Sequence, residues 1–306
     1  MHALQAPSAV VMIRPHAFTS NPETRDDNAF QTLSNRSTEA TSQAARDEHD
    51  AAVTALRDAG IRVHVFDDFG ENNTPDSVFP NNWFSTHPGG HVAIYPMYVT
   101  SRRRERRADV IEMLKAEYRV QDIIDYSGLE VDNLALEGTG AMVLDHLSRI
   151  AYTVSSHRAD PVLLERFCTH FNYEPMVFEA CDGEGRDVYH TNVLMGIGTQ
   201  YALICLDMIV DPARRAEVRM RLEESGRKVV DLSHAQIAEF AGNAIELTGR
   251  DGLLLALSQR ALDALTPDQI AVIKESATPL PLSVPTIETA GGSVRCMIAG
   301  IHLSRR

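Results

Sequence analysis

The segment GGSVRCMIAGIHL, residues 291–303, joins a glycine pair and polar residues to an apolar stretch that is typical of a strand. A glycine pair lets the backbone adopt dihedral angles closed to other residues and approach a ligand closely. Four earlier segments show the same order of polar turn and apolar stretch: PNNWFSTHPGGHVAIYP (80–96), EGTGAMVLDHLSRIAYTV (137–154), HTNVLMGIGTQYALICL (190–206) and GNAIELTGRDGLLLAL (242–257). The chain therefore contains five similar turn-to-strand segments.

The five segments recur at a nearly constant interval. One marker residue from each segment gives gaps of 55, 53, 53 and 53 residues, the markers being Asn82, Glu137, His190, Asn243 and Cys296. Near-equal units with two strands and a helix predict a closed, radially repeated α/β architecture. An ordinary α/β sheet with units of similar length explains the spacing equally well. In the closed arrangement, the five turns would meet at one end of the axis and share one pocket.

Helix and strand signals between these segments agree with an α/β fold. AVVMIRP (9–15) predicts a strand, and TEATSQAARDEHDAAVTALRDAG (38–60) predicts a long helix that Gly60 ends. DPARRAEVRMRLEESG (211–226) and TPDQIAVIKES (266–276) predict two further helices, each with a proline near its start. Thr266 is the expected N-cap of the second.

Composition is that of a globular protein with a sizeable core. The 306 residues are 44% hydrophobic and 23% charged, and 29 Lys and Arg against 42 Asp and Glu give a net charge of −13. This balance argues against nucleic acid as a partner, because binding it needs a broad phosphate-neutralising surface. No apolar run is long enough to predict a membrane span.

The four cysteines are scattered and do not predict a metal site or a disulfide framework. Cys168, Cys181, Cys205 and Cys296 form no CxxC pair and have no histidines at ligand spacing. Three of them are expected to pack as small hydrophobic residues. The reducing cytoplasm is the expected location.

Cys296, His190 and Glu137 are the candidate catalytic residues. Alone, Cys296 is better explained as a buried core cysteine and His190 as a structural histidine. Together, on turns of different units, they suggest a thiol nucleophile and a general acid/base. Glu137 precedes Gly-x-Gly and an apolar strand, so it either caps a turn or faces a pocket. Arg295, adjacent to the cysteine, could favour the thiolate.

Further polar residues are candidates for binding substrate. PDSVFPNNWF (75–84) holds Asp76, Asn81, Asn82 and the only tryptophan between turn-forming prolines, although an Asx-rich structural turn also explains it. The run RRRERR (102–107) would ordinarily be the solvated start of a helix. In an acidic protein, one of its arginines is a candidate clamp for a substrate carboxylate, and Arg158 in SSHR is a second.

At these residues the sequence resembles the guanidine-modifying, or pentein, superfamily over nearly the whole chain, from MIRPHAFTSNPET to GGSVRCMIAGIHL. Four blocks in the family's order and spacing carry the resemblance: PDSVFPNNWF, LEGTGAMVLD with SSHR, YHTNV and GGSVRCM. The chain looks most like the citrulline hydrolase (citrulline ureidase) branch, whose members are often labelled amidinotransferases. The resemblance implies one domain over residues 1–306, a five-bladed ββαβ propeller with pseudo-fivefold symmetry, and no metal or organic cofactor.

The resemblance also implies roles for the candidate residues. Cys296 would be the nucleophile, His190 the general acid/base and Glu137 the carboxylate that holds a substrate nitrogen. Arg102 and Arg158 match positions that hold the substrate's carboxylate in relatives. The implied substrate is a small amino acid. Neither nucleic acid nor a membrane is an expected partner, and the chain could form a homodimer.

Three asparagines depart from the pattern of deiminases and dimethylarginine hydrolases. Asn82 and Asn192 stand where those relatives commonly have acids that pair with a guanidinium, and Asn81 replaces an acid of some relatives. Carboxylates facing a neutral ureido group would stay uncompensated at a cost of several kcal/mol. An amide supplies both a donor and an acceptor to a ureido group. L-citrulline is therefore the first expected substrate.

Four alternatives remain open at this stage. The chain could be an arginine deiminase or dihydrolase, a dimethylarginine hydrolase, an amidinotransferase, or a catalytically silent propeller that serves as a binding module. Succinylarginine dihydrolase resembles the asparagine pattern although it begins from a guanidinium.

Overall fold

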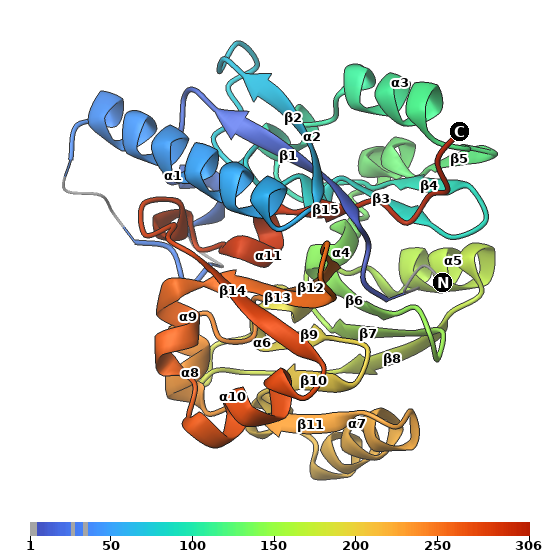
Figure 1. Ribbon diagram of the computed structural model, residues 1–306. Helices are drawn as coiled ribbons and strands as arrows, with labels where there is room; N and C mark the ends of the chain where they lie inside the picture. Colours follow the sequence, from blue (N-terminus) through green and yellow to red (C-terminus); the bar gives the residue numbers. More distant parts are fainter. Residues whose placement is uncertain (1–4, 26–27, 33–35) are drawn as a thin grey trace.

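Five three-stranded sheets make up the fold (Figure 1). The computed structural model describes residues 5–25, 28–32 and 36–306. The strands, in chain order within each sheet, are β3 (Phe84–His87), β4 (His91–Ile94) and β5 (Asp122–Asp125); β6 (Met142–Asp145), β7 (Ile150–Val154) and β8 (Glu174–Phe178); β9 (Met195–Ile197), β10 (Tyr201–Ile204) and β11 (Lys228–Asp231); β12 (Ile245–Thr248), β13 (Leu253–Ser258) and β14 (Ala277–Leu282); and β15 (Ala299–Gly300) with β1 (Ala9–Pro15) and β2 (Arg62–Asp68).

All five sheets have the same topology. The first strand pairs antiparallel with the second, and the second pairs parallel with the third, in every sheet. A parallel pair needs a crossover, and a helix occupies that crossover in each unit. The unit is therefore ββαβ, repeated five times, with β15 and β1 completing the fifth sheet from the two ends of the sequence. The predicted α/β class and repeating unit are confirmed.

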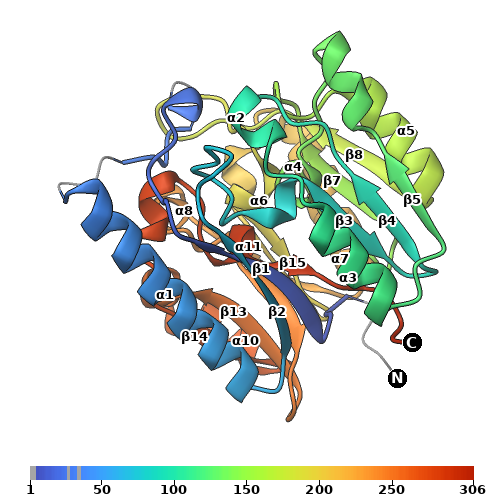
Figure 2. The ribbon, with the colours of Figure 1, turned by 90° about the horizontal axis from the view of Figure 1, so that it is seen from above.

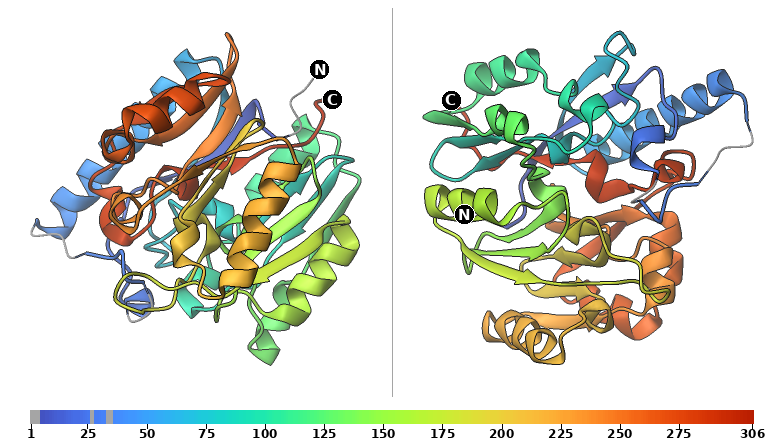
Figure 3. Two further views of the ribbon diagram at one scale, coloured as in Figure 1. Left: turned by 90° about the horizontal axis from the view of Figure 1, so that it is seen from below. Right: turned by 180° about the vertical axis from the view of Figure 1, so that it is seen from behind.

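The helices comprise longer elements in the crossovers and single turns before the first strands. The α-helices are α1 (Thr38–Asp58), α2 (Thr100–Arg103), α3 (Ala108–Glu117), α4 (Gly138–Ala141), α5 (Pro161–Phe171), α6 (Thr191–Leu194), α7 (Pro212–Glu224), α8 (His234–Ala238), α9 (Gln259–Ala264), α10 (Pro267–Lys274) and α11 (Val294–Met297). The 3₁₀ turns are η1 (Pro22–Thr24), η2 (Pro80–Asn82), η3 (Ser127–Asp132), η4 (Leu206–Met208) and η5 (Ile287–Ala290). Figure 3 shows the long helices on the outside of the sheets, with α1 in blue and α7 in light orange.

Local sequence signals explain where the long helices begin and end. The side chains of Asp160, Asp211 and Thr266 each accept a backbone N–H at a helix start, and a proline follows each of them. Helix α1 ends just before Gly60, whose φ of +92° is easily reached only by glycine. The boundaries predicted for α1, α7 and α10 are confirmed to within one or two residues.

Neighbouring units pack against one another. Strand β15 contacts β3, α4 contacts β3, β9 contacts both β6 and β12, and α11 contacts β13. Each sheet therefore has a neighbouring unit on both sides. The single-turn elements before the first strands also touch: η2 contacts α4 and α11, and α4 contacts α6. Figure 2 shows α4, α6 and α11 near the middle of the molecule.

The units are less regular than the marker residues suggest. First strands begin at Phe84, Met142, Met195, Ile245 and Ala299, so that the spacing varies between 50 and 58 residues. The markers gave an almost constant interval because Glu137 and His190 lie farther ahead of their strands than Asn82 and Asn243 do. In the described part of the chain, no helix combines the length and apolar character needed to cross a membrane.

Candidate active site

The candidate catalytic side chains come from turns that immediately precede the first strands of four sheets. Glu137 and His190 are the residues just before α4 and α6, and Cys296 lies within α11. Asn82 ends η2, ahead of β3. Because these turns touch one another, residues more than 200 positions apart in sequence share one pocket.

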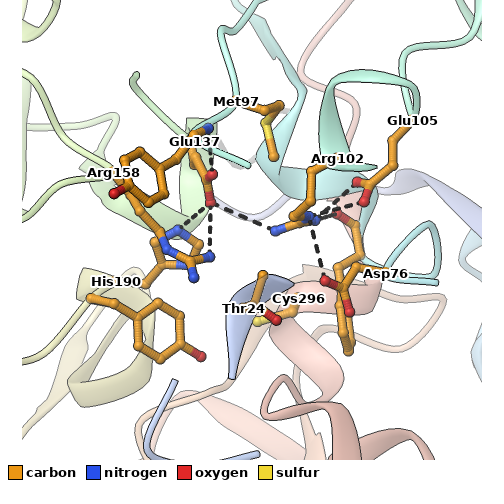
Figure 4. Close-up of polar contacts among 12 residues, drawn as sticks. Thr24, Asp76, Met97, Arg102, Glu105, Glu137, Arg158, His190 and Cys296 are labelled. Atoms are coloured by element: carbon orange, nitrogen blue, oxygen red, sulfur yellow. Dashed lines mark hydrogen bonds and ion pairs between the residues drawn. The ribbon is translucent and has the colours of Figure 1, made fainter. Parts of the chain in front are cut away.

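The pocket contains most of the residues expected from sequence. Those lining it are Thr24, Asn28, Asp76, Phe79, Asn82, Arg102, Arg158, Tyr189, His190, Ala290, Gly292 and Cys296. Figure 4 shows Cys296 below the space between Arg102 and His190, with Glu137 above. The sulfur and the imidazole therefore face one pocket, as the sequence predicts.

Cys296 is buried and receives two amide donors. Cys296 is 5% exposed. The Nδ2 groups of Asn192 and Asn243 each donate to Sγ at 3.2 Å. Asn192 was expected in the site, whereas Asn243 was identified only as a marker of the repeat. Two amide N–H groups from different turns are therefore directed at the sulfur.

The glycine pair before the cysteine has the role that its sequence indicates. Gly291 has a φ of +84°, and its carbonyl accepts a hydrogen bond of 2.8 Å from the Tyr189 hydroxyl. A Cβ on Gly292 would lie 2.8 Å from the Phe79 ring. Both positions therefore need glycine for the turn to fit into the pocket wall. The Arg295 side chain lines a second cavity and donates to the Ile298 carbonyl at 3.1 Å.

Glu137 and His190 form a buried hydrogen-bonded pair. His190 Nε2 lies 2.8 Å from Glu137 Oε2, and Glu137 Oε1 accepts the backbone N–H of Tyr98 at 3.0 Å. Burial lowers the pKa of His190 to about 4, against the opposing effect of Glu137. The imidazole is therefore neutral at pH 7 and can accept a proton. With Nε2 donating to the carboxylate, Nδ1 carries the free lone pair.

Two buried arginines hold Glu137 in its ionised form. Arg158 Nη1 lies 3.3 Å and Arg102 Nη1 lies 3.6 Å from Glu137 Oε2. Burial alone would raise the pKa of Glu137, but Arg158, His190 and Arg102 outweigh burial and hold this pKa far below its ordinary value. The Arg158 guanidinium also lies 4.8 Å from the centre of the Tyr189 ring.

Arg102 is the centre of a second buried network. Its guanidinium binds Glu105 through two hydrogen bonds, of 2.9 and 3.0 Å, and its Nε lies 3.9 Å from Asp76 Oδ2. With the amide of Asn82 oriented so that its oxygen faces Arg102, that oxygen accepts from Nη1 and Nη2 at 2.8 and 3.0 Å. These partners raise the pKa of Arg102 even though burial opposes them.

The burial of Arg102 differs from the solvated position that the basic run suggested. Arg102 and Glu105 are each 3% exposed, and their side chains bind each other in the interior. Glu105 was missed in the sequence because a single acid among five arginines resembles a surface charge pattern. Its only sequence signal is the i,i+3 spacing from Arg102.

Asp76 lines the same pocket as Cys296, whereas Asn81 lies beside Asn82 and outside the residues that line this pocket. Asp76 Oδ2 accepts from Asn21 Nδ2 at 2.8 Å, and burial raises the pKa of Asp76 against the opposing effect of Arg102. Asn81 Oδ1 accepts from the reoriented amide of Asn82 at 3.2 Å. Within the described residues, three buried polar atoms here have no hydrogen-bond partner: Asp76 Oδ1, Asn81 Nδ2 and Asn192 Oδ1. The site thus holds both donor and acceptor capacity for a polar ligand.

The arrangement is suited to attack on a carbon bonded to nitrogen. It offers a thiol beside two amide donors, a neutral imidazole that can accept and return a proton, and a carboxylate that accepts N–H groups. Among residues 5–25, 28–32 and 36–306, no group of three or more His, Cys, Asp or Glu residues has the geometry of a metal site.

A family model described as "N,N dimethylarginine dimethylhydrolase, eukaryotic" matches residues 14–303. No curated protein matches this sequence significantly.

Solved structures resemble the chain at low sequence identity. The apo structure of ArgZ, an arginine dihydrolase from the ornithine-ammonia cycle in Cyanobacteria, has a TM-score of 0.69 at 15% identity, and the match covers 95% of this chain and 40% of ArgZ. The substrate-bound N-terminal domain of ArgZ, a cysteine-to-serine mutant, has a TM-score of 0.70 at 15% identity. This match covers 96% of this chain and 99% of that domain. The chain thus spans about two fifths of the length of ArgZ.

A bacterial enzyme shares the fold over its full length. The cysteine-to-serine mutant of DDAH from Pseudomonas aeruginosa, complexed with citrulline, has a TM-score of 0.62 at 13% identity, and the match covers 98% of this chain and all of that one. At these identities the likeness shows the fold alone.

Proposed function

Because the chain belongs to the N,N dimethylarginine dimethylhydrolase family, we propose that it is a cysteine-dependent hydrolase acting on a carbon bonded to nitrogen. In this proposal, residues 1–306 form one catalytic domain, and the five ββαβ units close into a five-bladed propeller. Cys296 is the nucleophile, His190 the general acid/base and Glu137 the carboxylate that holds a substrate nitrogen. The cytoplasmic location and the homodimer stay predictions.

The proposed substrate is an amino acid with a terminal ureido group, with L-citrulline first. One observation carries this choice: Glu137, the carboxylate that contacts His190 in the described part of the chain, is already compensated, because two buried guanidinium groups lie 3.3 and 3.6 Å from its Oε2. A cationic substrate would add a third positive group around the same oxygen. A neutral ureido group avoids that repulsion, and asparagine amides can satisfy both its oxygen and its nitrogens.

The proposed mechanism starts from the neutral imidazole. His190 takes the proton of the Cys296 thiol, and the thiolate attacks the ureido carbon. The tetrahedral adduct breaks a C–N bond, and the leaving nitrogen takes the proton from His190. Water, deprotonated by His190, then hydrolyses the S-carbamoyl group. The carbamate breaks down to carbon dioxide and an amine, so that citrulline and one water give ornithine, one ammonia and carbon dioxide.

Arg102 and Arg158 are proposed to hold the substrate carboxylate, as relatives suggest. Both guanidinium groups line the pocket, but both contact protein carboxylates in this structure. Binding a substrate carboxylate would therefore add to these contacts or replace some of them.

A second candidate is hydrolysis of a guanidino substrate. The family match and the fold shared with an arginine dihydrolase both favour it. Arginine hydrolysed twice at the same carbon would pass through the ureido form and yield ornithine, two ammonia and carbon dioxide. This candidate uses the same nucleophile and differs in the group that the pocket accepts first.

The deciding experiment measures products from purified protein given citrulline, arginine or dimethylarginine separately. We expect ornithine and ammonia in equal amounts from citrulline, and no product from Cys296→Ser, which should keep the wild-type circular dichroism spectrum. Turnover of arginine or dimethylarginine without turnover of citrulline would overturn the ureido assignment. Near-normal activity of Cys296→Ser would overturn the nucleophile. Absence of turnover together with failure of a haloacetamidine probe to label Cys296 would favour the silent binding module.

A further inference from the structure

We propose that Asn243 is a further catalytic residue, whose side-chain amide stabilises the Cys296 thiolate. The inference rests on the proposed function, in which Cys296 is the nucleophile. Asn243 comes from the turn before β12, so it brings the fourth unit into a site that is otherwise built from turns of the other four.

The orientation of the Asn243 amide is fixed by two unambiguous partners. Its Oδ1 accepts the backbone N–H of Arg295 at 3.0 Å, and its Nδ2 donates to the backbone carbonyl of Asn192 at 3.1 Å. A backbone N–H can only donate and a carbonyl can only accept, so exchanging the oxygen and nitrogen would break both bonds. The second N–H of Nδ2 is therefore the group that meets Cys296 Sγ at 3.2 Å.

Asn192 is held less firmly than Asn243. Its Nδ2 reaches Sγ at the same distance, but its Oδ1 has no hydrogen-bond partner among the described residues. Asn192 is thus able to turn toward a substrate, whereas Asn243 keeps its donor on the sulfur. The two amides have different roles in this proposal: Asn192 serves the ligand, and Asn243 serves the nucleophile.

The backbone that carries Asn243 is constrained. Phe240 adopts a φ of +61°, which is rare for an aromatic residue, and its carbonyl accepts the Asn243 N–H at 2.9 Å. A Cβ on Gly242 would lie 2.6 Å from the Val193 carbonyl oxygen, so that this position admits no side chain. A tightly held turn gives Asn243, which is 1% exposed, little freedom to leave the sulfur.

Before the attack on the substrate carbon, the negative charge is on Cys296 Sγ. Once His190 has taken the proton of the thiol, the sulfur carries the negative charge and gains most from N–H donors that are already oriented toward it. Asn243 also binds the N–H of the residue before the cysteine, so one side chain fixes both the sulfur and its backbone. Removing the donor while keeping the acceptor separates these two effects.

The test measures alkylation of Cys296 by iodoacetamide in the full chain, because this reaction reports on the thiolate without any substrate. Asn243→Asp keeps an acceptor for the Arg295 N–H and replaces the donor by an oxygen. Asn243→Ala removes both contacts. Asn172→Asp, at an exposed helix end, is the matched control for the same chemical change. Labelling at Cys181, which is partly exposed, provides an internal reference in each variant.

We expect Asn243→Ala to slow alkylation of Cys296 at pH 7 about tenfold, and Asn243→Asp up to about a hundredfold, because the donor is replaced by a like charge. Both should move the half-maximal rate to higher pH while labelling of Cys181 stays unchanged. Wild-type rates and pH dependence at Cys296 in Asn243→Asp would overturn the proposal, as would an equal loss of labelling in Asn172→Asp. If citrulline is not a substrate but these rates change as expected, only the proposed substrate fails.

Discussion

Replacing Gly140 by alanine should damage the site without damaging the fold. Gly140 lies in α4, the turn that follows Glu137, and α4 contacts α6, the turn that follows His190. A Cβ built at Gly140 would lie 2.9 Å from Cε1 and Nδ1 of the His190 ring and would collide with the terminal amide of Asn82. Because Gly140 does not have a positive φ, alanine fits the backbone and the whole effect comes from these contacts.

The size of the effect follows from the overlap. Ordinary contacts of a Cβ begin at 3.4 Å, so the His190 ring must move by about half an ångström and the Asn82 amide by more. A misplacement of about 1 Å in a catalytic arrangement costs about a hundredfold in rate. Overpacking costs about 1–3 kcal/mol of stability, and alanine returns about 1 kcal/mol through its higher helix propensity.

The assay compares kcat/KM for ornithine release and the free energy of unfolding in urea. Gly128→Ala is the matched control, since a Cβ there meets no atom within 4 Å. We expect Gly140→Ala to lose about a hundredfold in kcat/KM and less than about 2 kcal/mol in stability. The reasoning is refuted if Gly140→Ala keeps kcat/KM within about threefold of Gly128→Ala.

Three further perturbations test the charges of the buried networks. Asn82→Asp adds a negative charge and should raise the ratio of arginine to citrulline kcat/KM at least about tenfold in a competition assay, and an unchanged ratio would contradict the amide argument. Glu105→Gln leaves the buried Arg102 with weaker partners and should lower the urea unfolding free energy by about 3 kcal/mol, whereas a loss below about 1 kcal/mol would show that this pair is not needed. His49 and His190 are neutral in the folded protein because burial lowers their pKa to about 4 from 6.5. At these two sites the unfolded chain binds protons that the folded chain does not between pH 6.5 and 4, so each histidine should make stability fall with acidification by about 1.4 kcal/mol per pH unit, and NMR signals of His49 and His190 that titrate near pH 6.5 in the folded protein would be inconsistent with neutral buried imidazoles.

Much of the fold could be predicted because local signals agree with the tertiary structure. Capping residues and prolines fix the starts of α5, α7 and α10, and the alternation of turn, strand pair and helix gives the repeating unit. The pocket could also be predicted in outline, since Cys296, His190 and Asn82 occupy corresponding turns. These features depend on local patterns that recur along the sequence.

The missing parts of the site depend on contacts between distant segments. The i,i+3 spacing allows Glu105 to pair with Arg102, but no local pattern shows that this pair is buried beside Asp76. Asn243 gave a marker of the repeat, but its contact with the sulfur requires knowing how two turns 53 residues apart face each other. The pairing of Arg102 and Arg158 with Glu137 was likewise hidden, because sequence does not show which carboxylate neutralises a buried cation.

Because the reactive groups come from different sheets, catalytic activity depends on the packing of all five units. The sulfur, the imidazole and the Glu137 carboxylate lie on three different units, and the amides of Asn82 and Asn243 lie on the other two, so loosening any one interface displaces one group relative to the rest. Unfolding of one unit should therefore abolish catalytic activity, whereas an active site built on a single loop could remain intact. Loss of turnover is then an early signal that two neighbouring units have begun to separate.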